Sequence, residues 1–209
     1  MNENMANNNR KKAAQKPKMR QSAPKKQNNN NNNNSRNSAG PNQALPVSGI
    51  EEILLVTVAS GQQSTMSIVP FDPSDSKTKV LKKFSEIYDN YTISDVAYKF
   101  TTDMSSLTSG NITMGVDYLT SDTAPTTREQ LARLTPHVSL PIKKSTGWMQ
   151  VPRAMYNANL IRPIGVATDP SSTPFQLCAL ATLATKTTEA TIVGALHIRY
   201  AVKFSGLKP

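Results

Sequence analysis

The sequence predicts an all-β protein, an eight-stranded antiparallel jelly-roll sandwich with two short loop helices and a disordered basic N-terminal arm. Three observations predict this architecture. Apolar and polar side chains alternate along several segments, no repeated βαβ unit is visible, and the arm before the first apolar segment is rich in basic residues. Strands with one apolar face pair into two sheets that bury those faces against each other. A jelly roll is the usual arrangement for an all-β domain of this length.

Residues 1–36 form the predicted disordered arm. Residues 1–49 hold nine cations against one anion, Glu3, and so carry +8 of the formal net charge of +10. This stretch has no aromatic residue and contains the polar run Asn28–Asn34. It can bury too little apolar surface to offset the entropy of ordering its backbone. The cations are Arg10, Lys11, Lys12, Lys16, Lys18, Arg20, Lys25, Lys26 and Arg36.

A basic arm attached to a nearly neutral body indicates a polyanionic partner. The arm cations are therefore candidate RNA-binding residues. Because the arm has no aromatic side chain on which a base can stack, we expect contacts to phosphates. A solubilising tail or a nuclear localisation signal would have a similar composition. Glycine and proline at positions 40, 41, 46 and 49 predict a hinge over residues 37–49, which leaves residues 50–209 as the folded domain.

Four strands are predicted in the first half of that domain. Residues 50–60 are rich in branched apolar side chains, which is typical of a buried strand, and residues 64–71 form a shorter one. Residues 92–100 place Val96, Tyr98 and Phe100 on one face and Ala97 and Lys99 on the other. Residues 111–119 align Ile112, Met114, Val116 and Tyr118.

The last strand has the clearest pattern. Within residues 195–204, one face carries Leu196, Ile198, Tyr200, Val202 and Phe204, and the other carries His197, Arg199 and Lys203. A period of two over this length indicates one face in the core and one face in solvent or at an interface. Fainter patterns predict strands within residues 138–151, 159–167 and 175–185.

Two short helices are predicted between the strands. Within residues 77–91, apolar side chains recur at helical spacing, at Val80, Leu81, Phe84, Ile87 and Tyr88. Residues 126–134 begin with Thr126 and Glu129 in a capping-box arrangement and place Leu131 and Leu134 on one side.

Composition argues against several classes of protein. The single cysteine, Cys178, excludes an internal disulfide framework, and we expect a buried thiol. No apolar run approaches the roughly 20 residues of a membrane helix, and no signal peptide is visible, so we expect no membrane partner and no secretion. His137 and His197 lack the neighbours that catalysis or zinc binding needs, so we expect no enzyme. Trp148 suits an interface anchor and a core residue at a strand end equally well.

The run "KFSEIYDNYTISDVAYKFTTDMSSLTSGNITMGVDYLTSDTAPTTREQL", residues 83–131, carries a family resemblance. It resembles the shell domain of tombusvirus- and sobemovirus-type coat proteins, which form capsids of small icosahedral positive-strand RNA plant viruses. The matching features, in order, are a helix ending in Phe84, Tyr88 and Tyr91, a Thr-Ser-Gly turn at 108–110, the strand "MGVDYL" and Pro125 before a second helix. "GALHIRYAVKFSGLKP", residues 194–209, is similar to the last shell strand of that family.

The resemblance implies a viral capsid protein that self-assembles into a T=3 icosahedral shell of many identical copies. It implies viral single-stranded RNA and other copies of the chain as partners. The expected location is the virion, with the host cell cytoplasm during assembly. Because the chain stops directly after the last strand, we expect a shell domain without a protruding domain.

The resemblance also implies a candidate calcium site between subunits at Asp117 and Asp122. Calcium needs several hard oxygen ligands, and Leu119 stands where the related motif often has another aspartate. We therefore favour the alternative, in which Asp117 faces solvent and Asp122 is an ordinary turn residue. No other cofactor is expected.

Two other function classes stay open at this point. A cellular single-stranded RNA-binding β-sandwich module with a basic tail would share the charge pattern, but would run as a monomer or small oligomer. An enzyme on a jelly roll is the third, and it lacks the cluster of His and Glu metal ligands that such enzymes usually carry.

Overall fold

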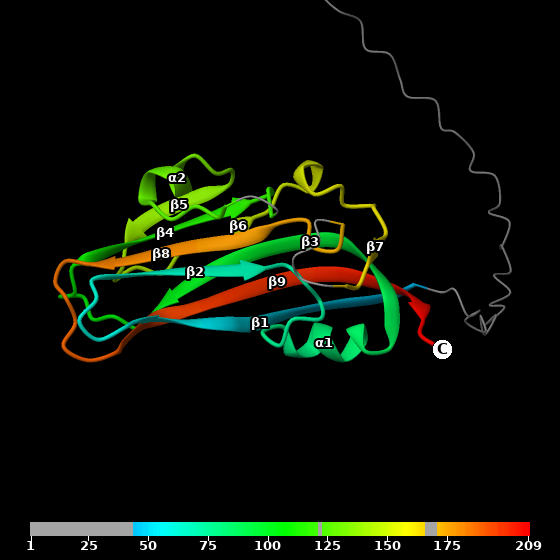
Figure 1. The fold of residues 1–209 in the computed structure, drawn as a ribbon, viewed down its shortest axis with the longest axis horizontal. Coiled ribbons are helices and arrows are strands. Elements are labelled where there is room, and N and C mark those ends of the chain that lie inside the picture. Colours follow the sequence, from blue (N-terminus) through cyan, green and yellow to red (C-terminus); the bar gives the residue numbers. More distant parts are fainter. Residues whose placement is uncertain (1–43, 121–122, 166–170) are drawn as a thin grey trace, which may run out of the picture. The chain divides into compact units, whose positions relative to one another are not determined.

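Two antiparallel sheets face each other across one apolar core in the computed structural model, which describes residues 44–120, 123–165 and 171–209 (Figure 1). The first sheet has the order β1-β9-β3-β6, and β7 also pairs with β3. Its strands are β1 (Leu45–Val58), β3 (Tyr88–Thr102), β6 (Met149–Gln150), β7 (Arg162–Pro163) and β9 (Thr191–Leu207).

The second sheet has the order β2-β8-β4-β5. Its strands are β2 (Ser64–Pro70), β4 (Gly110–Asp117), β5 (His137–Pro141) and β8 (Gln176–Leu183). Strands next to each other in a sheet are mostly distant in sequence, because the chain passes repeatedly between the two sheets. The predicted jelly-roll sandwich is confirmed. The described part of the chain has nine strands where we predicted eight, since residues 138–151 hold both β5 and β6.

The core lies between the sheets and is formed by the alternate residues that the sequence pattern indicates. On β9 the five predicted apolar side chains are buried, while Lys203 is exposed and Arg199 and His197 are half-buried. Ala97 of β3 is also buried, although its side chain points away from the core. It lies opposite Arg199 on β9 and Gln150 on β6, and these two longer side chains cover it.

The first strand starts earlier than expected. β1 begins at Leu45 rather than at Ile50, so Gly49 of the predicted hinge lies inside a strand. Its register neighbour on β9 is Tyr200, and a Cβ at position 49 would be 2.9 Å from the Tyr200 hydroxyl. Gly49 therefore makes room for an aromatic side chain instead of marking a bend. The proposed limits of the arm and hinge otherwise stay predictions.

Two short helices follow the predicted positions, with different ends. α1 (Lys79–Ser85) ends before Ile87, and Tyr88 already belongs to β3. Phe84 of this helix stacks on Phe204 of β9, with ring centroids 5.5 Å apart. No helix among the described residues is long and apolar enough to cross a membrane.

The capping box of the second helix, α2 (Arg128–Ala132), lies one residue later than predicted. Thr127 is the N-cap, and its hydroxyl accepts a hydrogen bond from the Gln130 backbone N–H at 3.2 Å. The Gln130 side-chain oxygen accepts in return from the Thr127 N–H at 3.1 Å. The predicted capping box of Thr126 and Glu129 is wrong. Thr127 can cap a helix as well as Thr126, and Gln130 can close a capping box as well as Glu129, so the sequence pattern does not distinguish the two pairs.

Candidate functional site

The predicted RNA-binding residues of the arm lie outside the described residues. This applies to Arg10, Lys11, Lys12, Lys16, Lys18, Arg20, Lys25, Lys26 and Arg36. Asp122, the second candidate calcium ligand, also lies outside them. The candidate sites that the structure does describe are the outer faces of the two sheets, which differ in charge.

The outer face of the first sheet carries the cations Lys99 of β3 and Arg199 and Lys203 of β9, together with His197, and we call it the cationic face. Lys99 is the register neighbour of His197, and both point away from the core. This arrangement follows from the alternation along β9, which puts apolar residues inside and basic ones outside. Glu52 of β1 lies opposite His197 and puts a carboxylate on the same side of the sheet.

Trp148 lies on the cationic face, just before β6. The Lys99 ammonium lies over its ring, 5.9 Å from the ring centroid, and the Arg199 guanidinium carbon is 5.2 Å from it. The ring is half-buried and is not among the residues of the apolar core. Of the two interpretations of Trp148, the one that places it in the core is therefore wrong.

A polar network continues from Arg199 along the same face. The Arg199 guanidinium donates to the Gln150 side-chain oxygen at 3.2 Å. The Gln150 amide nitrogen donates to Asp95 Oδ1 at 2.7 Å and to the Val96 carbonyl at 2.9 Å. Asp95 Oδ1 also lies 3.6 Å from the Arg153 guanidinium. One carboxylate thus fixes the amide of Gln150 and the side chain of Arg153.

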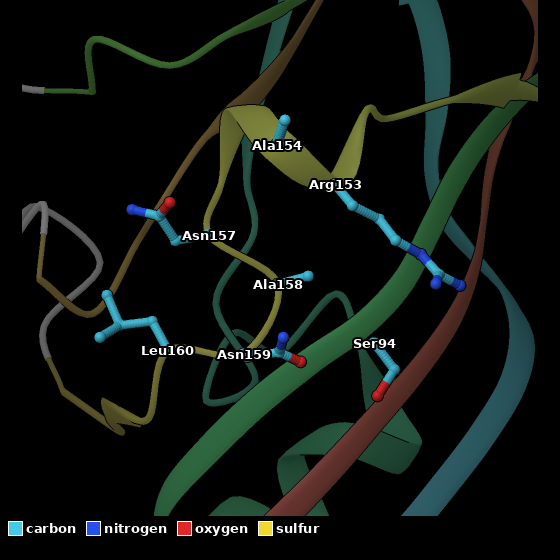
Figure 2. A pocket seen from close by; sticks show the side chains of 7 residues that line it. All are labelled: Ser94, Arg153, Ala154, Asn157, Ala158, Asn159 and Leu160. Carbon is cyan, nitrogen blue, oxygen red and sulfur yellow. The ribbon is translucent and has the colours of Figure 1, made fainter.

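A hollow of about 740 Å³ adjoins this network. Figure 2 shows Arg153 reaching from the 3-10 helix η1 (Arg153–Met155) toward β3, which carries Ser94, while Asn157 and Asn159 come from the following loop. The polar groups around the hollow are amides, a hydroxyl and a guanidinium. Such groups bind phosphates and nucleotide edges, and none of these lining side chains is a general base.

On the outer face of the second sheet, the outward side chains of β2, β8 and β4 are neutral except for Asp117 at one end, and Arg128 of α2 donates to Ser139 of β5 at 3.1 Å. The outward residues include Met66 and Ile68 of the edge strand β2, and Leu180 and Thr182 of β8 and Thr113 of β4 in the centre of the sheet. The neutral part of this face can be covered by another protein surface at little desolvation cost.

Asp117, the predicted calcium ligand, is buried, with 7 % of its surface exposed. Its Oδ1 accepts from the Leu119 N–H at 3.0 Å, and its Oδ2 accepts from the Gln176 amide at 2.9 Å. The favoured alternative, a solvent-facing Asp117, is therefore wrong. Among the described residues no group of three or more His, Cys, Asp or Glu side chains gathers. They supply a single carboxylate and do not by themselves fit a calcium site, so the calcium site at Asp117 and Asp122 stays a prediction.

Cys178 is buried next to Asp117, as predicted. Burial raises the pKa of its thiol to about 12, and the Asp117 charge adds to the shift. The two histidines lie apart from each other. The ring of His137 is exposed and its Nδ1 is 2.9 Å from the Leu134 carbonyl, while His197 belongs to the cationic face.

The sequence matches the viral coat protein (S domain) family over residues 11–209. The chain belongs to this family. The coat protein is a structural component of the virion and not an enzyme, which confirms both predictions. Family membership also implies that it assembles with other subunits, and it excludes the cellular RNA-binding module.

Solved virus structures share the fold of this coat protein. That of tobacco necrosis virus matches with a TM-score of 0.67 at 15% identity, covering 80% of this chain and 98% of its own. The structure of cocksfoot mottle virus matches with a TM-score of 0.63 at 13% identity, covering 79% of this chain and 97% of its own. The structure of maize chlorotic mottle virus matches with a TM-score of 0.62 at 20% identity, covering 78% of this chain and 95% of its own. No curated protein sequence matches the chain.

Proposed function

We propose that this coat protein closes a T=3 icosahedral shell and packages single-stranded RNA with its basic N-terminal arm. The observation that carries the proposal is the uneven charge of the chain. Residues 1–49 hold +8 of the net charge of +10, so the remaining 160 residues hold only +2. Opposite charges on RNA and arm favour binding, while the nearly neutral body lets many copies pack side by side.

The total positive charge of the arms in one shell is comparable with the negative charge of a small RNA genome. About 180 copies with nine arm cations each supply roughly 1,600 positive charges. Since each nucleotide carries one phosphate charge, this would neutralise a large share of an RNA of a few thousand nucleotides. Binding of this kind releases counterions and tolerates any sequence.

The experiment compares the RNA content of purified particles. In the test variant, the nine arm cations are replaced by glutamine in the full chain, which preserves the length of the arm. In the matched control, Asn28–Asn34 is deleted, which shortens the arm and leaves its charge unchanged. We expect the charge variant to lose RNA and the control to retain it. Equal RNA content in both would overturn the proposal.

Electron microscopy of the same particles tests the shell geometry. A T=3 shell predicts particles of uniform diameter with about 180 copies. Small oligomers, or shells of another copy number, would contradict the proposed T=3 geometry. The role of the arm is tested separately, by the RNA content of the particles.

A further inference from the structure

We propose that the cationic face of the shell domain is a second RNA-contacting surface, where Trp148 stacks on a base and Lys99 and Arg199 bind the adjacent phosphates. The inference rests on the proposed packaging of RNA and adds base contact to it. It places these contacts on the folded domain, at residues separate from the arm.

The position of Trp148 is the first argument. It is the only tryptophan of the chain, and its half-buried ring lies on the sheet surface rather than among the core residues. Proteins that bind single-stranded nucleic acids commonly combine an aromatic ring with nearby cations, because a base stacks on the ring and the cations bind phosphates.

The contacts that hold the cations are weak enough to be exchanged. A cation near an exposed aromatic ring gains less than a base that stacks on such a ring. When a base covers Trp148, Lys99 and Arg199 can therefore turn to the phosphates on either side of it. Arg199 stays positioned by its hydrogen bond to Gln150 at 3.2 Å.

The surface continues beyond one nucleotide. Gln150 and Arg153 both contact Asp95, and Arg153 borders the hollow that also contains Asn157 and Asn159. These amides and the guanidinium can hydrogen-bond a neighbouring nucleotide. Asp95 is the carboxylate inside the network, where its charge is offset by Arg153.

The charge of the cationic face favours RNA over a second copy as its partner. The outward side chains of β2, β8 and β4 in the second sheet are neutral apart from Asp117, and the cation that reaches that sheet, Arg128, is bound to Ser139. The cationic face carries Lys99, Arg199 and Lys203 against Glu52 and the paired Asp95, which suits a polyanion.

The intrinsic fluorescence of the full-length protein tests the proposal, because Trp148 is its only tryptophan. Single-stranded oligouridylate and inorganic polyphosphate are added in separate titrations. Both are polyanions and both should bind the arm, but only the RNA has bases. We expect the RNA to quench the emission and polyphosphate to leave it unchanged.

Either of two results would overturn the inference. In the first, RNA at saturation leaves the emission unchanged, or polyphosphate quenches it equally. In the second, the emission changes when RNA-free subunits assemble and RNA has no further effect, which would make the cationic face a contact between copies.

Variants separate this surface from the arm. In the full chain with nine glutamines in the arm, Trp148→Ala should weaken RNA binding about 5- to 150-fold. Arg199→Gln should also weaken it. Arg133→Gln is the matched control and should change it little, because Arg133 is exposed and follows α2, which packs on the second sheet. If the arm variant still packages RNA and still shows quenching, the arm proposal fails and this inference stands. If packaging depends on the arm and RNA causes no quenching, the arm proposal stands and this inference fails.

Discussion

The hydroxyl of Tyr200 donates a 2.7 Å hydrogen bond to Oε1 of Glu51. The other oxygen of Glu51 accepts from the Val80 backbone N–H at 2.9 Å, at the start of α1. One carboxylate thus connects β1, β9 and the first turn of a helix, where negative charge is favourable. The side chain of Glu51 therefore fixes α1 against the edge of the first sheet.

Tyr200→Phe should lower the free energy of unfolding by about 1.5–3 kcal/mol, since it removes a hydrogen bond to a charged group. Tyr98→Phe is the matched control. The Tyr98 hydroxyl is buried and has no hydrogen-bond partner among the described residues, so its removal should be neutral or stabilising. Urea denaturation of unassembled subunits measures both, and a larger loss in Tyr98→Phe would contradict the assigned bonding.

Alkaline pH should destabilise the subunit. Burial raises the pKa of Tyr91, Tyr98 and Tyr200 above the ordinary value of 10.0, and it raises the pKa of Tyr118 to about 12. Above pH 10 the unfolded chain loses these protons while the folded chain keeps them. Stability is therefore fully present below pH 10 and is lost as the pH rises toward the folded-state values. Denaturation midpoints measured at several pH values above 10 test this loss of stability. The loss should be smaller in Tyr98→Phe, which lacks one of the buried hydroxyls.

Gly194→Ala should prevent normal folding or cost more than about 3 kcal/mol, because the new Cβ has no room. It would lie 2.3 Å from the Thr101 carbonyl oxygen and 2.6 Å from the ring of Phe100. Gly147→Ala is the control, since nothing lies within 4 Å of its Cβ position. Soluble yield and thermal unfolding compare the two variants, and equal stability would show that β9 and β3 can separate locally.

Chelation with EDTA near neutral pH should leave the diameter of the particle unchanged. The two oxygens of Asp117 already accept hydrogen bonds from Leu119 and Gln176, so its charge does not require an ion. Light scattering before and after chelation measures the diameter. Swelling that calcium reverses, and that Asp117→Asn abolishes, would establish the calcium site instead.

Raising the salt concentration should weaken RNA binding steeply. With about eight phosphates neutralised per arm, an increase from 50 to 200 mM should cost roughly three decades of affinity. Binding of a short RNA to unassembled subunits, followed by fluorescence anisotropy, gives the slope. The arm variant with nine glutamines should show a much flatter one.

The features that were predictable from the sequence are local and repeat along the chain. The alternation from Leu196 to Phe204 identifies the inner face of β9 without knowledge of its partner strands. The capping box of α2 was predictable only to within one residue, because Thr126 and Thr127 both suit an N-cap.

The features that were not predictable depend on partners distant in the sequence. Asp117 is buried because Gln176, on another strand, donates to it. Trp148 contacts Lys99 and Arg199 only after β6 and β9 have both paired with β3. Gly49 suggests a bend until the Tyr200 ring is placed over it. In each case the register between strands determines which side chains meet, and a local sequence pattern contains no information about that register.

The chemistry of Cys178 makes the shell convenient to label. The only thiol of the chain is buried, and it stays protonated at neutral pH because its pKa is raised to about 12. Maleimides react with exposed thiolates, so they should leave it intact. A cysteine introduced at an exposed position such as Lys203 would then be the single reactive group on each subunit, and a dye placed there would be repeated in every copy of the capsid.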